Sequence, residues 1–512
     1  MTEPWWKTGV IYQIYPRSFL DTNGSGVGDL EGIRSKLDYL EWLGVGALWL
    51  SPIFPSPMTD FGYDVADYCD IDPLFGDLAT FDALVGEAHR RGLKVLLDWV
   101  PNHTSDQHPW FIESRASRDN AKGDWYWWRD GSPDRPPNNW EAAFVGGPAW
   151  TWSPEREQWY LHNFLSTQPD LNWRNPEVVD AMHDTLRFWL DRGVDGFRMD
   201  VIHLLGKDPA LPDIPDGTEL IGRVNFHDWP HTHEILRDIR STLDSYPGDR
   251  VAVGEVYLLS TALVAQYYGK DDELHLAFNF PPLFAPWEAQ PFRRRIDRVI
   301  EELSDASWPT WVLSNHDNPR HATRYGGDER KARAAAVLLL TLRGTPFLYA
   351  GEELGLEDAV IPPDRVVDPG GRDGCRAPIP WTKESGHGWS TDDPWLPWPP
   401  DAANRSVATQ KADAESTLHL YRRLLIARRR SPALSGGSFS WLDSPDHVLA
   451  YERGMGDDVR RVAINFGDAP TTLGPVGGWT IEVASDSAGE GKTFNGELAP
   501  WRAVVLRPPA QR

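Results

Sequence analysis

Short apolar runs alternate along the chain with longer stretches in which apolar residues recur every three or four positions. The short runs predict β-strands, and the longer stretches predict amphipathic helices. The expected strands are residues 10–14, 47–50, 94–99, 196–199, 251–255, 274–280, 311–314 and 346–349. The expected helices are residues 30–43, 78–91, 176–192, 232–243, 261–268, 292–303, 329–342 and 416–430. Because strand and helix alternate repeatedly, the pattern predicts an α/β fold, a (β/α)8 TIM barrel with an inner parallel sheet.

Two stretches depart from this alternation and predict additional domains. Between the third strand and the next helix lies a long segment rich in Trp, Pro, Gly and Asp, which is too long for a plain loop. We therefore expect an inserted domain at 104–175, which divides the barrel into residues 1–103 and 176–430. After residue 430, short alternating runs separated by turn residues predict a C-terminal antiparallel β domain at 431–512.

Composition narrows the range of partners. The chain of 512 residues carries a formal net charge of −24, which argues against binding to nucleic acid or to anionic membranes. Its 26 tryptophans suit sugar binding, because indole faces stack on sugar rings, although a Trp-rich core would give the same count. No apolar run approaches the ~18 residues of a membrane helix, and the N-terminal segment lacks a signal-peptide pattern. We expect a cytoplasmic monomer or homodimer that acts on a small neutral substrate.

The strand expected at 196–199 carries an unusual charged pair. Arg198 and Asp200 are two positions apart, so on a strand their side chains point to the same face. A face lined with bulky apolar groups gives little reason to place charges there. The two residues form either a structural ion pair or a catalytic carboxylate that an arginine holds ionised at the end of a barrel strand.

Three other expected strands also end in polar residues, namely Asp98, Asn102 and His103, then Glu255, and finally Asn315, His316 and Asp317. In a barrel of this kind the carboxyl ends of all strands face one site. Converging carboxylates without metal-ligand spacing suit glycoside hydrolysis, which needs one ionised carboxylate and one protonated carboxyl group. Arg198 favours the ionised form of Asp200, and burial would raise the pKa of Glu255 and suit it to general acid catalysis.

Four segments, DWVPNH, GFRMD, GEV and SNHD, resemble in order and spacing the signature segments of the α-amylase superfamily, glycoside hydrolase family 13. The resemblance extends over essentially the whole chain. QPDLN at 168–172, FGYDV at 61–65 and GCRAPIPW at 374–381 resemble the α-glucosidase and oligo-1,6-glucosidase branch. The resemblance implies a retaining, exo-acting hydrolase that removes terminal glucose, α-1,4- or α-1,6-linked, from short oligosaccharides and needs no cofactor for catalysis.

The resemblance also implies a role for each residue of the site. Asp200 would be the nucleophile that forms a covalent β-glucosyl intermediate, Glu255 the acid and base, and Asp317 a ligand of the sugar hydroxyls. Asp60 and Arg376 would close the pocket around the far hydroxyls of the terminal glucose. The substrate-binding residues expected on these grounds are Asp60, Tyr63, His103, Phe144, Phe164, Gln168, Arg198, His316 and Arg376.

Specificity is expected to depend on two residues after the nucleophile. Valine at position 201 resembles enzymes that prefer α-1,6 bonds, although a β-branched residue is also ordinary in a strand. His203 stands where many members of the branch carry Asn, so the leaving-group subsite departs from the pattern. A trehalose synthase or sucrose isomerase of the same family would share every catalytic carboxylate and stays an alternative.

Two alternatives from other classes fit the sequence less well. A non-catalytic transporter subunit would need a membrane helix and would not need the full set of acids. A metal-dependent barrel hydrolase would need closely spaced histidines, whereas His103, His203 and His316 form no such pair.

Residues 21–32, DTNGSGVGDLEG, place oxygen-bearing groups at alternate positions, as in a calcium loop. The candidate ligands are the side chains of Asp21, Asn23, Ser25 and Asp29 and the carbonyl group of Val27. Gly32 replaces the bidentate Glu of an EF-hand, and a plain Gly/Asn/Asp turn would give a similar pattern. Resemblance to the calcium or magnesium loop of the family favours a structural Ca2+ or Mg2+ remote from catalysis.

Overall fold

The computed structural model describes residues 3–215, 223–304, 307–368, 370–474 and 478–509. Its centre is a sheet of eight parallel strands in the order β10-β11-β1-β2-β3-β7-β8-β9. These strands are β1 (Ile11–Ile14), β2 (Ala47–Leu50), β3 (Lys94–Trp99), β7 (Gly196–Met199), β8 (Val251–Gly254), β9 (Leu276–Ala277), β10 (Thr310–Val312) and β11 (Thr345–Tyr349). The predicted barrel is therefore confirmed, with strand limits that differ by one or two residues except at β9.

The seam between β9 and β10 is closed by a side chain instead of a strand ladder. Thr310 Oγ1 donates a hydrogen bond to the carbonyl group of Ala277 at 2.7 Å and accepts one from the backbone N–H of Asn279 at 3.3 Å. The strand expected at 274–280 is correspondingly short, because its last residues bond to this side chain instead of extending the ladder.

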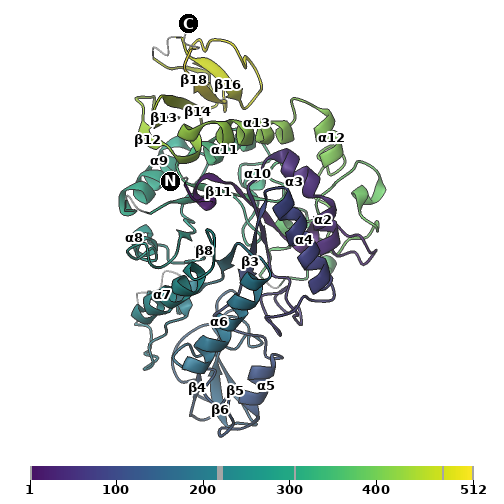
Figure 1. Ribbon diagram of the computed structural model, residues 1–512, viewed down its shortest axis with the longest axis vertical. Coiled ribbons are helices and arrows are strands. Elements are labelled where there is room, and N and C mark those ends of the chain that lie inside the picture. Colours follow the sequence, from purple (N-terminus) through teal and green to yellow (C-terminus); the bar gives the residue numbers. More distant parts are fainter. Residues whose placement is uncertain (1–2, 216–222, 305–306, 369, 475–477, 510–512) are drawn as a thin grey trace.

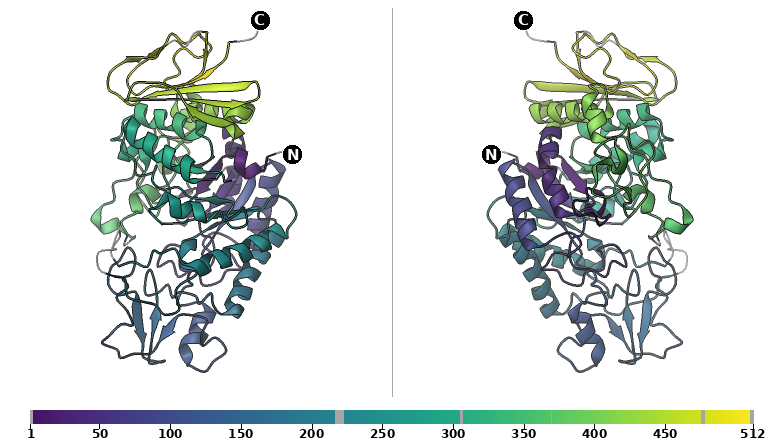
Figure 2. Two further views of the ribbon diagram at one scale, coloured as in Figure 1. Left: turned by 90° about the vertical axis from the view of Figure 1, so that its left-hand side faces the viewer. Right: turned by 90° about the vertical axis from the view of Figure 1, so that its right-hand side faces the viewer.

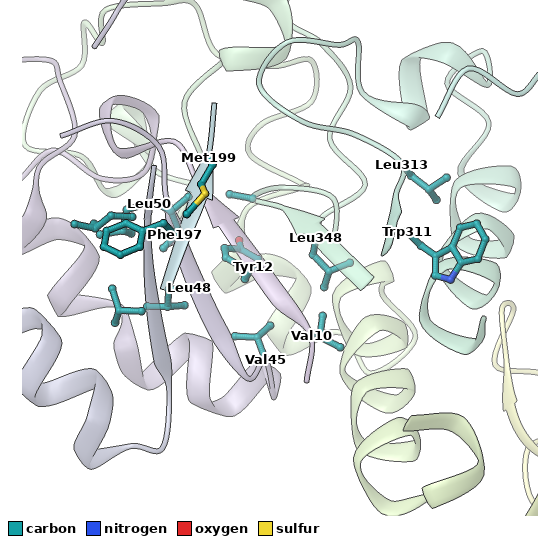
Figure 3. Close-up of a cluster of buried hydrophobic side chains, with 14 of the residues drawn as sticks. Val10, Tyr12, Val45, Leu48, Leu50, Phe197, Met199, Trp311, Leu313 and Leu348 are labelled. Carbon is teal, nitrogen blue, oxygen red and sulfur yellow. The ribbon is translucent and has the colours of Figure 1, made fainter. Parts of the chain in front are cut away.

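Alternation along the strands separates two layers of side chains. One apolar cluster, which includes Ile11, Trp49 and Phe347, fills the interior of the barrel. The larger cluster packs the outward-facing side chains of the strands against the helices, and Figure 3 shows Phe197 and Met199 of β7 within it. Arg198, between these two residues, therefore faces the interior, where the site is built.

Helices cover the outside of the barrel (Figure 1). They are α2 (Leu30–Ser35), α3 (Leu37–Leu43), α4 (Leu78–Arg90), α6 (Pro176–Asp191), α7 (Pro230–Asp244), α8 (Thr261–Gln266), α9 (Ala289–Glu302), α10 (His321–Arg324), α11 (Glu329–Thr341) and α13 (Thr417–Arg430). The single helix expected at 30–43 is wrong, because Lys36 leaves the helical conformation between α2 and α3. Ser35 Oγ donates to the Gly32 carbonyl at 2.8 Å, a side-chain bond that competes with a continuous helix.

Two smaller units lie at opposite ends of the barrel (Figure 2). The segment after β3 holds helix α5 (Pro109–Ala116) and a sheet of β4 (Trp128–Arg129), β6 (Gln158–Leu161) and β5 (Trp150–Ser153). The C-terminal unit is the predicted antiparallel sheet, formed by β12 (Ser438–Trp441), β13 (Val448–Met455), β14 (Asp458–Asn465), β18 (Ala503–Arg507) and β16 (Thr480–Ala484). None of the helices in the described part of the chain is long and apolar enough to span a membrane.

Candidate active site

The carboxyl ends of β7 and β8 hold two acids side by side. The backbone N–H of Asp200 donates to the carbonyl group of Trp99 at 2.9 Å, and that of Glu255 donates to Met199 at 2.9 Å. Beyond Asp200 the chain turns sharply, with Val201 in the left-handed region at φ 37°, a conformation that costs energy for a β-branched residue. The Val201 N–H donates a hydrogen bond to Glu255 Oε2 at 3.2 Å, so the strained turn is held against the second acid.

Arg198 lies at the centre of the site and contacts three carboxylates. Its Nη1 donates to Asp98 at 2.7 Å and to Asp200 at 2.6 Å, and its Nη2 lies 2.7 Å from Glu255 Oε2. The residue is only 2% exposed, so these interactions act in a medium that screens charge weakly. One buried cation therefore compensates three buried acids.

Burial and Arg198 act in opposite directions on these acids. Burial raises the pKa of both Asp200 and Glu255, and the positive charge of Arg198 lowers both. Burial has the larger effect, so the resulting pKa is about 7 for Asp200 and about 8 for Glu255. The pKa of Asp98 is likewise raised by burial, to about 6. Arg198 therefore lowers the Asp200 pKa as the sequence predicts, but burial outweighs it. Glu255 keeps the higher pKa and is the acid that holds its proton longest as the pH rises.

Asp317 has the opposite character. Burial raises its pKa, but the charges of His316, Arg372 and Arg376 together hold the pKa of this carboxyl well below its usual range. Arg372 Nη1 and Arg376 Nη2 lie 3.0 and 3.2 Å from its Oδ1. Asp317 is thus a fixed negative charge that can accept hydrogen bonds and does not take part in proton transfer.

Tyr63 is held rigidly on one wall of the pocket. Its ring stacks on His316 at a centroid distance of 5.4 Å with an interplanar angle of 6°. Its hydroxyl lies 2.5 Å from His316 Nε2 and donates to Asp98 Oδ2 at 3.0 Å. The amide of Gln13 reaches the other ring nitrogen of His316 at 2.7 Å, so the histidine is fixed as well.

The far end of the pocket is closed by Arg372, which sequence reasoning missed. Arg372 Nη2 bonds Asp60 Oδ1 at 2.7 Å and Nη1 bonds Asp317, so one guanidinium spans the pocket between the two acids. Arg376, expected to close the pocket together with Asp60, is fully buried behind this bridge and donates from Nε to the His316 carbonyl at 2.8 Å. The motif RDGCR contains both arginines, and nothing in the pattern distinguishes which of them reaches the cavity.

The structure brings most of the expected site residues to a single pocket. The residues that line it are Asp60, Tyr63, His103, Phe144, Phe164, Asp200, Val201, Glu255, Asp317 and Arg372. Phe144 is 71% exposed with φ at 67°, and its ring stacks on Phe164 at the pocket. The expected residues that lie behind the lining are Gln168, Arg198, His203, His316 and Arg376.

His203 is fully buried and reaches the pocket only through its neighbours. Its ring meets Phe226 edge-on at a centroid distance of 5.1 Å, and its Nδ1 lies 3.4 Å from the backbone N–H of Tyr257. His203 therefore supports the segment that follows Glu255 and the aromatic group beside it, whereas Val201 contacts the cavity directly.

The candidate cation loop lies outside this pocket lining. Asp21 accepts backbone N–H bonds from Asn23, Gly24 and Gly26 at 2.8 to 3.2 Å. Asp29 caps helix α2 by accepting from Gly32 N–H at 2.6 Å. Both carboxylates are almost fully buried. No group of three or more His, Cys, Asp or Glu in the described residues is arranged to hold a metal ion, so a cation here would also need neutral oxygen ligands.

The family model described as the α-amylase catalytic domain matches residues 13–437, which include every residue of the pocket. The chain belongs to the α-amylase family. A second model, described as a domain of unknown function, matches residues 435–506, the C-terminal sheet.

Several family members resemble the chain over nearly its whole length. A probable α-glucosidase of Rhizobium meliloti is 43% identical, with 91% of this chain and 90% of the relative covered. An oligo-1,6-glucosidase of Parageobacillus thermoglucosidasius is 36% identical over 91% of each chain.

Solved structures of the family share the fold closely. An α-glucosyl transfer enzyme is 43% identical with a TM-score of 0.91, covering 99% of this chain and all of the other. The trehalulose synthase of Pseudomonas mesoacidophila is 34% identical with a TM-score of 0.90 over the same shares. The family and the fold predicted from the signature segments are confirmed.

Proposed function

We propose that this protein is a retaining, exo-acting α-glucosidase that removes terminal α-linked glucose from short oligosaccharides. The observation that carries the proposal is that one guanidinium holds the two acids at the ends of neighbouring strands. Arg198 Nη1 lies 2.6 Å from Asp200 Oδ1, and Arg198 Nη2 lies 2.7 Å from Glu255 Oε2. Two carboxyl groups bound to the same guanidinium lie close together, which suits a retaining glycosidase, where one carboxylate attacks the sugar directly, better than an inverting one, where the two groups stand further apart.

The order of the two pKa values supports a division of roles. Asp200, which loses its proton first, attacks the anomeric carbon while Glu255 donates its proton to the departing glycosidic oxygen. The bond from the anomeric carbon to that oxygen breaks as the bond to Asp200 forms. Glu255, now ionised, takes a proton from water, whose oxygen attacks the same carbon and releases Asp200. Anomeric configuration is inverted twice and so retained.

The closed end of the pocket supports exo-action on short chains. The bridge from Asp60 through Arg372 to Asp317 blocks the direction in which a longer polysaccharide would continue. These charged groups also offer several hydrogen bonds to the outer hydroxyls of a single terminal glucose. The open side, with Phe144 at its edge, is left for the leaving group.

A second candidate differs only in the fate of the glucosyl intermediate. A trehalulose synthase and an α-glucosyl transfer enzyme share this fold at 34% and 43% identity. In such an enzyme a sugar hydroxyl replaces water in the second step. We favour hydrolysis because curated relatives that match most of the chain include a probable α-glucosidase and an oligo-1,6-glucosidase. Val201, which contacts the cavity, is our candidate for selecting the linkage.

We also propose that residues 21–29 bind a structural Ca2+ or Mg2+. The loop offers two buried carboxylates, the Asn23 amide and the Val27 carbonyl, all oxygen ligands of the kind these ions prefer. Ser25 supplies a hydroxyl that lies 3.1 Å from the Val27 carbonyl. An ion bound by this loop would stabilise the fold and leave the chemistry to the pocket, whose lining does not include the loop.

Product analysis tests the proposed activity. The wild-type protein is expected to release glucose from maltose or isomaltose, with free glucose as the main product at low substrate concentration.

Asp200→Asn should keep the thermal unfolding midpoint within a few degrees and lose roughly 10^4-fold or more in kcat, because the covalent nucleophile is removed. Near wild-type turnover of an aryl α-glucoside by this variant would refute the assignment. Rearranged disaccharides formed from sucrose in place of glucose would favour the second candidate.

The pH dependence of kcat/KM is expected to be bell-shaped with its maximum near neutrality. As the pH falls through about 7, Asp200 gains a proton and can no longer attack, and as it rises through about 8, Glu255 loses the proton it must donate. The leaving group of a dinitrophenyl α-glucoside departs without a proton donor. With this substrate, the kcat/KM profile of Glu255→Ala should therefore lose its alkaline limb and keep its acid limb. An unchanged alkaline limb would show that another group supplies the proton.

Chelation tests the cation site independently of activity. Dialysis against EDTA should lower the melting temperature by several degrees, and added Ca2+ or Mg2+ should restore it, because an ion that binds only the folded state stabilises it. Asp21→Asn should abolish this response. Asp29→Ser removes the carboxylate ligand but keeps a side chain that can cap α2, so any loss of the response to cations reflects the missing ligand and not the missing cap. If neither the chelator nor the added cations changed the melting temperature, the proposed cation site would be wrong.

A further inference from the structure

A buried lysine lies behind the sugar pocket and takes no part in the chemistry described above. Lys207 is fully buried, and its ammonium group donates to three oxygens. They are Asp170 Oδ2 at 2.9 Å, Asn102 Oδ1 at 2.8 Å and the Leu204 carbonyl at 2.7 Å. An ammonium group has three protons and no acceptor capacity, so these contacts use all of its hydrogen-bonding capacity.

The contact with Lys207 fixes the orientation of the Asn102 amide. Because Lys207 can only donate, the atom of Asn102 that faces it must be the oxygen. The amide nitrogen, a donor, then faces His103 Nδ1 at 3.1 Å. His103 Nδ1 must therefore be an unprotonated acceptor.

The other nitrogen of His103 leads independently to the same assignment. His103 Nε2 lies 3.1 Å from the backbone carbonyl of Tyr63, which can only accept. The Gln168 amide is not an acceptor for this proton, because the atom that faces His103 Nε2, at 3.2 Å, is the amide nitrogen. That nitrogen donates to Asp60 Oδ2 at 3.0 Å, and Gln168 Oε1 accepts from the Leu165 N–H at 3.0 Å. Both ring nitrogens thus specify a neutral imidazole with its proton on Nε2.

We propose that Lys207 is a positioning residue that acts through Asn102 to hold His103, a residue of the pocket lining, as a neutral imidazole with its proton on Nε2. His103 lines the pocket, whereas Lys207 and Asn102 lie behind it. The expected effect on kcat/KM rests on the proposed function, but the proton arrangement belongs to the free protein and is measurable without substrate.

The charges around His103 explain why a cation is useful behind it. Burial lowers the pKa of His103, the carboxylates of Asp170 and Asp60 raise it, and Lys207 lowers it. Without Lys207, the two acids would favour the doubly protonated ring. Asp170 also accepts from the Asn163 backbone N–H at 3.0 Å, so the same ion pair anchors the inserted segment to the barrel.

Nitrogen-15 NMR of the full-length protein, labelled at histidine, measures the proton arrangement directly. His103→Gln identifies the two ring signals. In the wild type at neutral pH, Nδ1 is expected to show the shift of an unprotonated nitrogen and Nε2 that of a protonated one. In Asn102→Asp, a carboxylate that cannot donate replaces the amide, so Nδ1 should become protonated, and kcat/KM should fall about 10- to 100-fold.

Lys207→Met removes the charge at nearly constant size, and Lys94→Met is its matched control. Lys94 begins β3 and pairs at 2.9 Å with Asp195, the residue before β7, so this ion pair lies at the amino ends of the strands, away from the site. Lys207→Met should raise the pH at which His103 becomes doubly protonated, whereas Lys94→Met should leave its signals unchanged. Should Lys207→Met fail to fold, Asn102→Asp decides the question.

Two results would overturn the inference. One is a wild-type His103 protonated on Nδ1. The other is a folded Asn102→Asp protein whose His103 signals match the wild type, which would make Lys207 and Asn102 purely structural. A protein that does not hydrolyse α-glucosides would refute the proposed function and leave the NMR result standing, so the two failures are distinguishable.

Discussion

The site depends on a single buried cation. Asp98, Asp200 and Glu255 all lie within 2.7 Å of the Arg198 guanidinium, and all four residues are nearly inaccessible to water. Burying one uncompensated carboxylate is costly, and burying three together is untenable without an opposite charge. Arg198 makes the cluster possible, because its positive charge lowers the pKa of each acid while burial raises it.

The barrel supplies the geometry that this cluster needs. The register of the parallel strands pairs Asp98 with Arg198 and Arg198 with Val253, so the charged residues emerge at neighbouring positions on the interior face. The strained turn at Val201 then directs the chain outward immediately after Asp200. Loops from more distant parts of the chain add the fixed charge of Asp317 and the closing bridge of Arg372. Rigid strands hold the reacting groups, and the loops define which sugar can reach them.

Much of this arrangement could be predicted from the sequence because it rests on local patterns. The strands that carry Asp98, Arg198 and Glu255 are continuous apolar runs, and their charged ends stand out against them. The strand expected at 274–280 was predicted too long, because the contact that replaces the ladder there comes from the Thr310 hydroxyl on another strand. The break at Lys36 was missed because the helical periodicity continues through it.

Roles that depend on long-range contacts were the hardest to predict. Arg372 and Arg376 are equivalent in the sequence, and only the fold decides which one meets Asp60. Lys207 looks like an ordinary surface lysine until Asp170 and Asn102, from other segments, enclose it. His203, expected among the residues that set specificity, is buried behind the pocket lining and packs against Phe226.

The central claim is that Asp200 attacks the anomeric carbon of the sugar while Glu255 donates a proton to the leaving oxygen and later takes one from water. It is tested most directly by intact-protein and peptide mass spectrometry of Glu255→Gln mixed with α-glucosyl fluoride. Fluoride departs without an acid, and the missing base slows the second step, so a covalent intermediate should accumulate. The account predicts a protein heavier by one glucosyl unit, with the label on the peptide that contains Asp200. A label on another residue, or turnover to β-glucose with no labelled protein, would contradict it.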